Sequence, residues 1–138
     1  MATHAYIFHT DGRVSQRSFG ANANMSFAVD AVRKLMPTCQ YVEMDVSDRT
    51  DGRQWVLIMD EEGMFRQSPN GGLGGFLMNL ERLWYGDVML VQCSDSDPEQ
   101  LCPLDPLPCK PGDIVGLYMH LALFRNDWRR AHGLPPAN

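Results

Sequence analysis

The sequence predicts an α+β fold: a single domain with a small antiparallel or mixed sheet, two packed helices and a C-terminal helix. Its 138 residues match the length of one ordinary domain. Short apolar stretches with strand propensity alternate with stretches of helical periodicity, and an interval rich in Pro, Asp and Ser sets off the last helical stretch. We therefore expect an α+β core over residues 1–92, a Pro/Asp-rich loop over 93–112, and a C-terminal helix with a tail over 113–138, packed on the same domain.

The first third of the chain predicts a β-hairpin and a helix. Residues 5–9 have strand propensity, and the Asp-Gly pair after them is typical of a hairpin turn because both residues tolerate a positive φ. Residues 13–19 then predict an edge strand. Apolar residues recur at three- and four-residue spacing over 25–36, which predicts a helix with Asn24 or Ser26 as its N-cap. The proline that follows ends this helix.

The middle of the chain predicts further strands. Residues 39–46 alternate acidic or aromatic side chains with apolar ones, as a strand with one wet face does. Residues 55–59 are continuously apolar, which predicts a central strand covered on both faces. Residues 60–63 predict a tight acidic turn, and residues 64–66 a short return strand.

The second half predicts two more helices and one strand. A Gly-rich tract at 70–75 leads into residues 73–84, which have helical periodicity, and Gly86 suits the end of that helix. Residues 88–91 predict a short, fully apolar strand. Helical spacing returns over residues 114–128, although the first six of these also fit a last strand.

Four short motifs carry a resemblance to a known family: Tyr41-Val42-Glu43, Asp60-Glu61-Glu62-Gly63, Asn70 and Gly86-Asp87-Val88. They resemble a family of small phage- and plasmid-encoded domains of unknown function, over about residues 5–92. The resemblance implies a viral or mobile-element setting and a small α+β fold, and it offers no established catalytic residues. The chain departs from the family pattern at Asp60, where the family has Asn, and in its longer Gly-rich tract and helix.

Composition and charge disfavour two classes of partner. The formal net charge of -5 disfavours nucleic acid, because nucleic-acid binders usually carry a basic stripe. The amino-terminal segment lacks the features of a signal peptide, and no apolar run reaches the length of a membrane span. We therefore expect a soluble, cytoplasmic protein that does not bind membranes, located in an infected host cell if the family resemblance holds. Its four cysteines are then expected to be thiols.

The C-terminal stretch is the predicted binding surface. It combines aromatic and arginine side chains, which are enriched at the energetic centres of protein interfaces. The alternative is an ordinary helix with one buried face and one wet face. The residues concerned are Phe124, Arg125, Trp128, Arg129 and Arg130.

A carboxylate-lined pocket is the alternative candidate site. Glu43 and Asp45 share one strand face, and they could join Asp60 and Glu62 across the sheet, beside Asn70. Such a group could hold a ligand or act as acid and base. Adjacent carboxylates at a turn are, however, more often simply solvated.

Metal and nucleophilic sites have weaker support. The cysteines and His120 lack the close Cys-x₂₋₄-Cys pair of structural zinc sites, so we expect no metal and no cofactor. His4 and His9 flank the first strand, lie on opposite faces by parity and have no evident partner. No local signature of a Ser-His-Asp or Cys-His site is present, although such sites also assemble from residues distant in sequence.

These features favour a non-enzymatic interaction protein that binds a host or partner macromolecule in an accessory or defence-evasion role. The expected partner is a protein, and a homodimer is also compatible with the sequence. The alternative is a small-molecule-binding or hydrolytic domain that uses the carboxylate-lined pocket. An exposed apolar patch around Trp128, or self-association, would favour the first reading, and converging carboxylates would favour the second.

Overall fold

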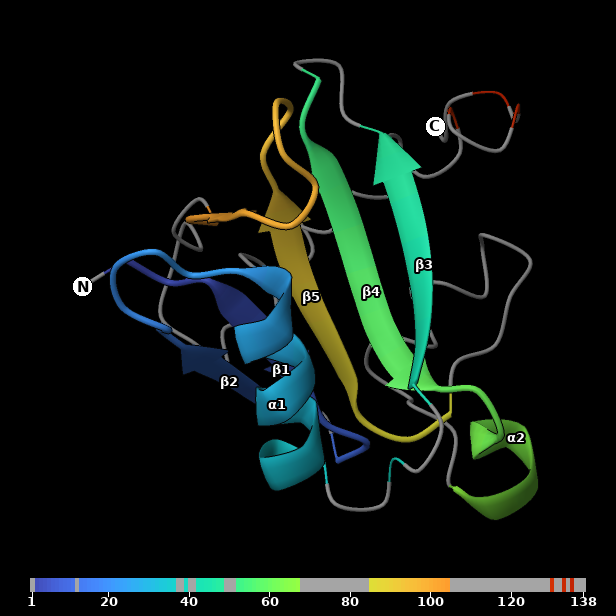
Figure 1. Cartoon of the computed structure of the whole chain (residues 1–138). Helices are drawn as coiled ribbons and strands as arrows, with labels where there is room; N and C mark the ends of the chain where they lie inside the picture. Colours follow the sequence, from blue (N-terminus) through green and yellow to red (C-terminus); the bar gives the residue numbers. More distant parts are fainter. Residues whose placement is uncertain are drawn as a thin grey trace.

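In the part of the chain that the computed structural model describes, six strands form one antiparallel sheet (Figure 1). The structure describes residues 2–11, 13–36, 39, 42–48, 52–67, 85–104, 130, 133 and 135. Its elements are β1 (Ala5–Phe8), β2 (Val14–Arg17), α1 (Met25–Leu35), β3 (Val42–Asp48), β4 (Gln54–Asp60), α2 (Gly63–Arg66), β5 (Val88–Cys93) and β6 (Leu101–Cys102).

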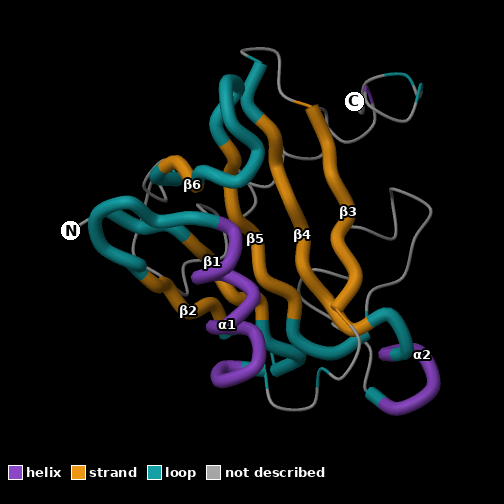
Figure 2. The backbone as a smooth tube through the Cα atoms, viewed as in Figure 1, coloured by secondary structure: helices purple, strands orange, loops and turns teal. Residues whose placement is uncertain are grey.

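The strand order is β2-β1-β5-β4-β3, with β6 paired to β5 (Figure 2). All of these strand pairs are antiparallel, and residues directly opposite one another lie on the same face of the sheet. β5 lies between the N-terminal hairpin and the β3–β4 pair, although it comes late in the sequence. The sheet therefore joins segments that are far apart along the chain.

Helix α1 covers one face of the sheet. Its apolar residues recur at three- and four-residue spacing, and Ala28 and Val32 are buried. The side chain of Asn24 caps the helix by accepting hydrogen bonds from the amides of Ser26 and Phe27, so the predicted helix and its N-cap are confirmed. The core on this face is formed mainly by Ala5, Ile7, Ala28, Val32, Met36, Val56, Ile58, Met89 and Val91.

The opposite face of the central strands is buried as well. Tyr6, Trp55, Leu57 and Leu90 are at most 1% exposed, and they alternate along their strands with residues of the α1 side. β4 and β5 are therefore buried on both faces. The prediction that residues 55–59 form a strand covered on both sides is confirmed.

The predicted fold class is wrong. The described part of the chain is mainly antiparallel sheet with a single packed helix, α1, whereas two packed helices and a C-terminal helix were expected. Residues 73–84 and 114–128, which carried the other two expected helices, lie outside the described residues. The sequence pattern also underestimated the sheet, because β3 and β5 extend beyond the predicted strands and β6 lies within the predicted Pro/Asp-rich loop.

The predicted return strand at residues 64–66 is part of the short helix α2. The cause is the side chain of Asp60, which is buried at the end of β4. Its Oδ1 accepts a hydrogen bond from the amide of Glu62 at 3.1 Å, and its Oδ2 accepts one from Nε2 of Gln67 at 2.7 Å. These bonds turn the chain locally, and α2 replaces the second arm of a hairpin. Neither α1 nor α2 is long and apolar enough to cross a membrane.

Candidate functional site

Three adjacent strands bring Ser15, His9 and Asp87 together. In the pairing of β1 with β2 and with β5, Phe8 lies opposite Val14 on one side and Val88 on the other. Continuing both ladders by one residue places His9 beside Asp87 and diagonally across from Ser15. By this alternation all three lie on the face of the sheet that α1 covers, at the end where β1 stops and β5 begins.

The three side chains form a continuous hydrogen-bonded chain. Nδ1 of His9 lies 3.0 Å from Oδ2 of Asp87, and Nε2 of His9 lies 2.7 Å from Oγ of Ser15. Because a carboxylate can only accept, Nδ1–H donates to Asp87, and Nε2 of the neutral ring then accepts the hydroxyl proton of Ser15. The amide of Thr10 donates to Oδ1 of Asp87 at 3.1 Å and fixes the carboxylate. The side chains of His9 and Asp87 are only 15% and 26% exposed.

No partner was predicted for His4 or His9, and the structure shows partners for both. Nδ1 of His4 accepts a hydrogen bond from the amide of Phe19 at 3.0 Å, and the two rings stack with centroids 6.0 Å apart. His4 is buried, and this burial lowers its pKa from the ordinary value. Strand parity alone could not reveal these partners, since they depend on which strands are neighbours.

The structure divides the predicted carboxylate site between two faces of the sheet. Glu43 and Asp45 lie opposite Met59 and Leu57, whereas Asp60 lies opposite Val42, and consecutive residues of a strand point to opposite faces. The carboxylate of Asp60 bonds within its own turn. Glu62 is exposed, and Asn70 lies outside the described residues.

The predicted C-terminal surface is placed only in part. Arg130 is exposed, while Phe124, Arg125, Trp128 and Arg129 lie outside the described residues. That binding surface therefore stays a prediction.

Strand β3 carries an apolar surface that the sequence pattern assigned to the core. Met44 and Val46 are 42% and 45% exposed, whereas Glu43 and Asp45, on the predicted wet face, are only partly exposed. Val42 packs against the α1 core, but Met44 and Val46 lie on that same face beyond it. We name Met44 and Val46 the β3 strip. Its exposure is the reverse of what its hydrophobicity predicts.

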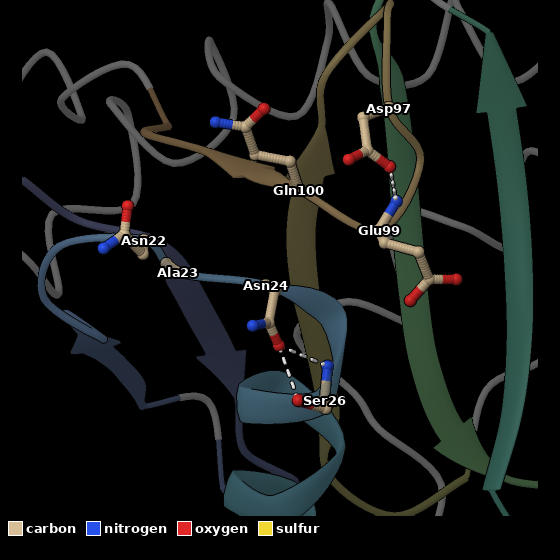
Figure 3. Close-up of a pocket in the computed structure, with 7 residues that line it drawn as sticks. All are labelled: Asn22, Ala23, Asn24, Ser26, Asp97, Glu99 and Gln100. Atoms are coloured by element: carbon tan, nitrogen blue, oxygen red, sulfur yellow. Dashed lines mark hydrogen bonds between the residues drawn. The ribbon is translucent and has the colours of Figure 1, made fainter.

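A polar cavity of about 480 Å³ lies at the N-terminus of α1 (Figure 3). At the helix start, the amides of Ser26 and Phe27 donate to Oδ1 of Asn24, and across the cavity the amide of Glu99 donates to Oδ1 of Asp97. The helix end therefore offers an anion little beyond its own cap. The cavity is lined by Asn22, Ala23, Asn24, Ser26, Asp97, Glu99 and Gln100.

No group of three or more metal-ligating side chains gathers among the described residues. Cys93 and Cys102 are free thiols. Burial raises the pKa of Cys93 to about 11, so its thiol is protonated at neutral pH and is a poor nucleophile and metal ligand. Cys109 lies outside the described residues.

The comparisons with known proteins found no match to this chain, whether with protein-family models, with curated proteins or with solved structures.

Proposed function

We propose that this protein is an interaction protein that binds a protein partner through the β3 strip. One observation carries the proposal: on β3, Met44 and Val46 are more exposed than Glu43 and Asp45, the acidic residues that alternate with them. A strand that served only the core of this domain would show the opposite order. Apolar side chains that lie uncovered beside a packed core are suited to burial against another molecule.

Covering the β3 strip with a partner would bury further apolar surface and so favour binding. Fully burying an exposed Met or Val side chain is worth roughly 1.5–3 kcal/mol, and because Met44 and Val46 are 42% and 45% exposed, covering them would give roughly half of that each. A few central residues, surrounded by contacts that exclude water, supply most of the affinity of a typical interface, although Trp, Tyr and Arg fill this role more often than Val. The strip is therefore proposed as the centre of a larger contact that includes the polar residues around it.

Charge favours a partner different from the protein itself. Two copies would each bring a formal net charge of -5 to a dimer, and this repulsion opposes their association. We propose a partner with basic residues around an apolar centre, because opposite charges steer association and favour the correct pairing. The family resemblance further suggests a host protein as the partner, an accessory or defence-evasion role and a cytoplasmic location.

The test is site-specific photo-crosslinking in cells of the source or its host. A photoreactive residue is placed at position 46, and a matched control carries it at Arg33, which is exposed on α1. We expect one distinct partner to crosslink from position 46 and not from position 33. The identified partner, purified, should bind the M44S/V46T variant at least tenfold more weakly than the wild type.

Three outcomes would overturn the proposal. These are equal crosslinking from both positions, unchanged affinity of the double variant, and crosslinking from position 46 only to a second copy of the chain. The last result would instead identify a homodimer interface. Thermal unfolding of the double variant controls for misfolding, since substitutions at exposed positions leave stability within about 0.5 kcal/mol.

A further inference from the structure

We propose that Ser15 is a nucleophile for acyl transfer, activated by His9 and oriented through Asp87. The inference goes beyond partner binding and uses none of the residues of the β3 strip. It rests on the chain of hydrogen bonds from Oγ of Ser15 to Nε2 of His9 and from Nδ1 of His9 to Asp87. Serine hydrolases of unrelated folds share this order of hydroxyl, imidazole and carboxylate.

Hydrogen bonds hold Ser15, His9 and Asp87 in the arrangement that this chemistry requires. The Asp87 carboxylate accepts both from His9 and from the amide of Thr10, so its position is fixed on two sides. Its bond to Nδ1 fixes the imidazole tautomer, which leaves the lone pair of Nε2 directed at the Ser15 hydroxyl 2.7 Å away. A hydroxyl in this position can lose its proton as its oxygen attacks.

The place of Ser15 in the sheet makes it accessible. It is partly exposed on β2, the outermost strand of the described sheet next to β1. Because the amide of His9 donates to the carbonyl oxygen of Arg13, the backbone of Arg13 faces β1, and the alternation along β2 directs the amide of Gln16 away from β1. This N–H, adjacent to the nucleophile, is the backbone donor that we assign to the oxyanion of a tetrahedral intermediate.

The reaction we infer is hydrolysis of a carboxylic ester. Oγ of Ser15 attacks the carbonyl carbon while its proton passes to Nε2 of His9. The bond from that carbon to the alcohol oxygen then breaks, and the alcohol leaves with the proton from His9. Water attacks the acyl-serine and gives a proton to Nε2. The acyl–Oγ bond breaks, the proton returns to Oγ, and the carboxylic acid leaves. One ester and one water give one acid and one alcohol.

The experiment uses the full chain and a small alkyl fluorophosphonate. Oγ of an activated serine displaces fluoride from this reagent and forms a stable bond to phosphorus. Intact mass spectrometry measures the rate of the adduct, and peptide mapping locates it. We expect one adduct, on Ser15, and hydrolysis of p-nitrophenyl acetate that the adduct abolishes. Ser15→Ala should give neither, and Asp87→Asn should label more slowly by a factor on the order of 10³–10⁴.

Controls separate an activated nucleophile from a structural link between strands. Ser94→Ala should label like the wild type, because Ser94 bonds to Ser96 and Asp95 and to no imidazole. His9→Gly should not be labelled, and added imidazole should raise its labelling rate at least tenfold. A purely structural role of His9 would not produce this rescue. The inference is overturned if the folded wild type is not labelled at Ser15, or if Asp87→Asn labels at the wild-type rate. The first of these tests needs no variant to fold.

Discussion

On the face of the sheet that α1 covers, the side chains around β2, β1 and β5 differ from those on β3 in their exposure. At the β2–β1–β5 end, polar Ser15, His9 and Asp87 are drawn into a closed set of hydrogen bonds. At the β3 end, apolar Met44 and Val46 are left exposed. Exposure on this face is thus decided by which strands the helix covers and which strands are neighbours. Hydrophobicity along the sequence does not decide it.

The width of a helix explains the difference. A helix with its side chains is about 10–12 Å across, and neighbouring strands lie about 4.8 Å apart, so one helix covers two or three strands. The core under α1 accordingly involves β1, β5 and β4. Only Val42, at the start of β3, packs against it.

The largest expected effect is on the free energy of unfolding, and it distinguishes two residues that face each other across β3 and β4. Met44 lies opposite Ile58, which is fully buried. Ile58→Ala should lower the free energy of unfolding by about 2–5 kcal/mol, because it removes buried methyl groups and leaves a cavity. Met44→Ala should lower it by less than about 0.5 kcal/mol. Urea unfolding measures both, and equal losses would show that the two ends of the face do not differ.

A smaller effect is expected at the polar end. His9→Ala removes both hydrogen bonds of the ring and leaves Asp87 and Ser15 without these contacts. We expect the free energy of unfolding to fall by about 1–3 kcal/mol. In a double-mutant cycle with Ser15→Ala, the coupling energy between the His9 and Ser15 side chains should differ from zero. Additive effects in that cycle would contradict a direct bond between them.

The smallest effect depends on pH and on the buried ring of His4. Burial lowers the pKa of His4 below its ordinary 6.5, so the folded state favours the neutral ring. The resulting stability is complete above pH 6.5, where the unfolded chain is neutral as well, and it is lost as the pH falls through the folded-state pKa. The slope for this one proton is at most about 1.4 kcal/mol per pH unit.

Urea unfolding at a series of pH values between 7.5 and 5 would measure that loss. His4→Gln keeps an acceptor but cannot take up the proton. The variant should therefore lose less stability than the wild type over this range. An identical pH dependence of the two proteins would mean that protonation of His4 does not contribute to the loss of stability at lower pH.

The sequence predicted local structure well and long-range placement poorly. The capped helix at residues 25–35, the flanking hairpin and the buried strand around Trp55 follow from propensity and periodicity, which neighbours in sequence determine. The His9 chain could not be predicted, because it depends on β5 pairing with β1 across about eighty positions. The turn after Asp60 also escaped prediction, because a single buried carboxylate selected a helical turn over a hairpin.

The β3 strip also shows that sequence patterns predict local structure but not the tertiary arrangement. Alternation on β3 correctly grouped Met44 with Val46 on one face. It could not show that the core under α1 involves β1, β5 and β4 and leaves Met44 and Val46 exposed on the same face. A strand pattern gives the faces of a strand, and only the tertiary arrangement gives what covers them.

Methionine oxidation tests the exposure of the β3 strip most directly. The folded protein is treated with dilute hydrogen peroxide, and each sulfoxide is quantified by peptide mass spectrometry over time. We predict that Met44 oxidises at a rate near that of the denatured chain. Met36, Met59 and Met89, which are at most 3% exposed, should be strongly protected. If Met44 is protected as well as Met89 is, the strip is covered within the protein, and the proposed binding surface is contradicted.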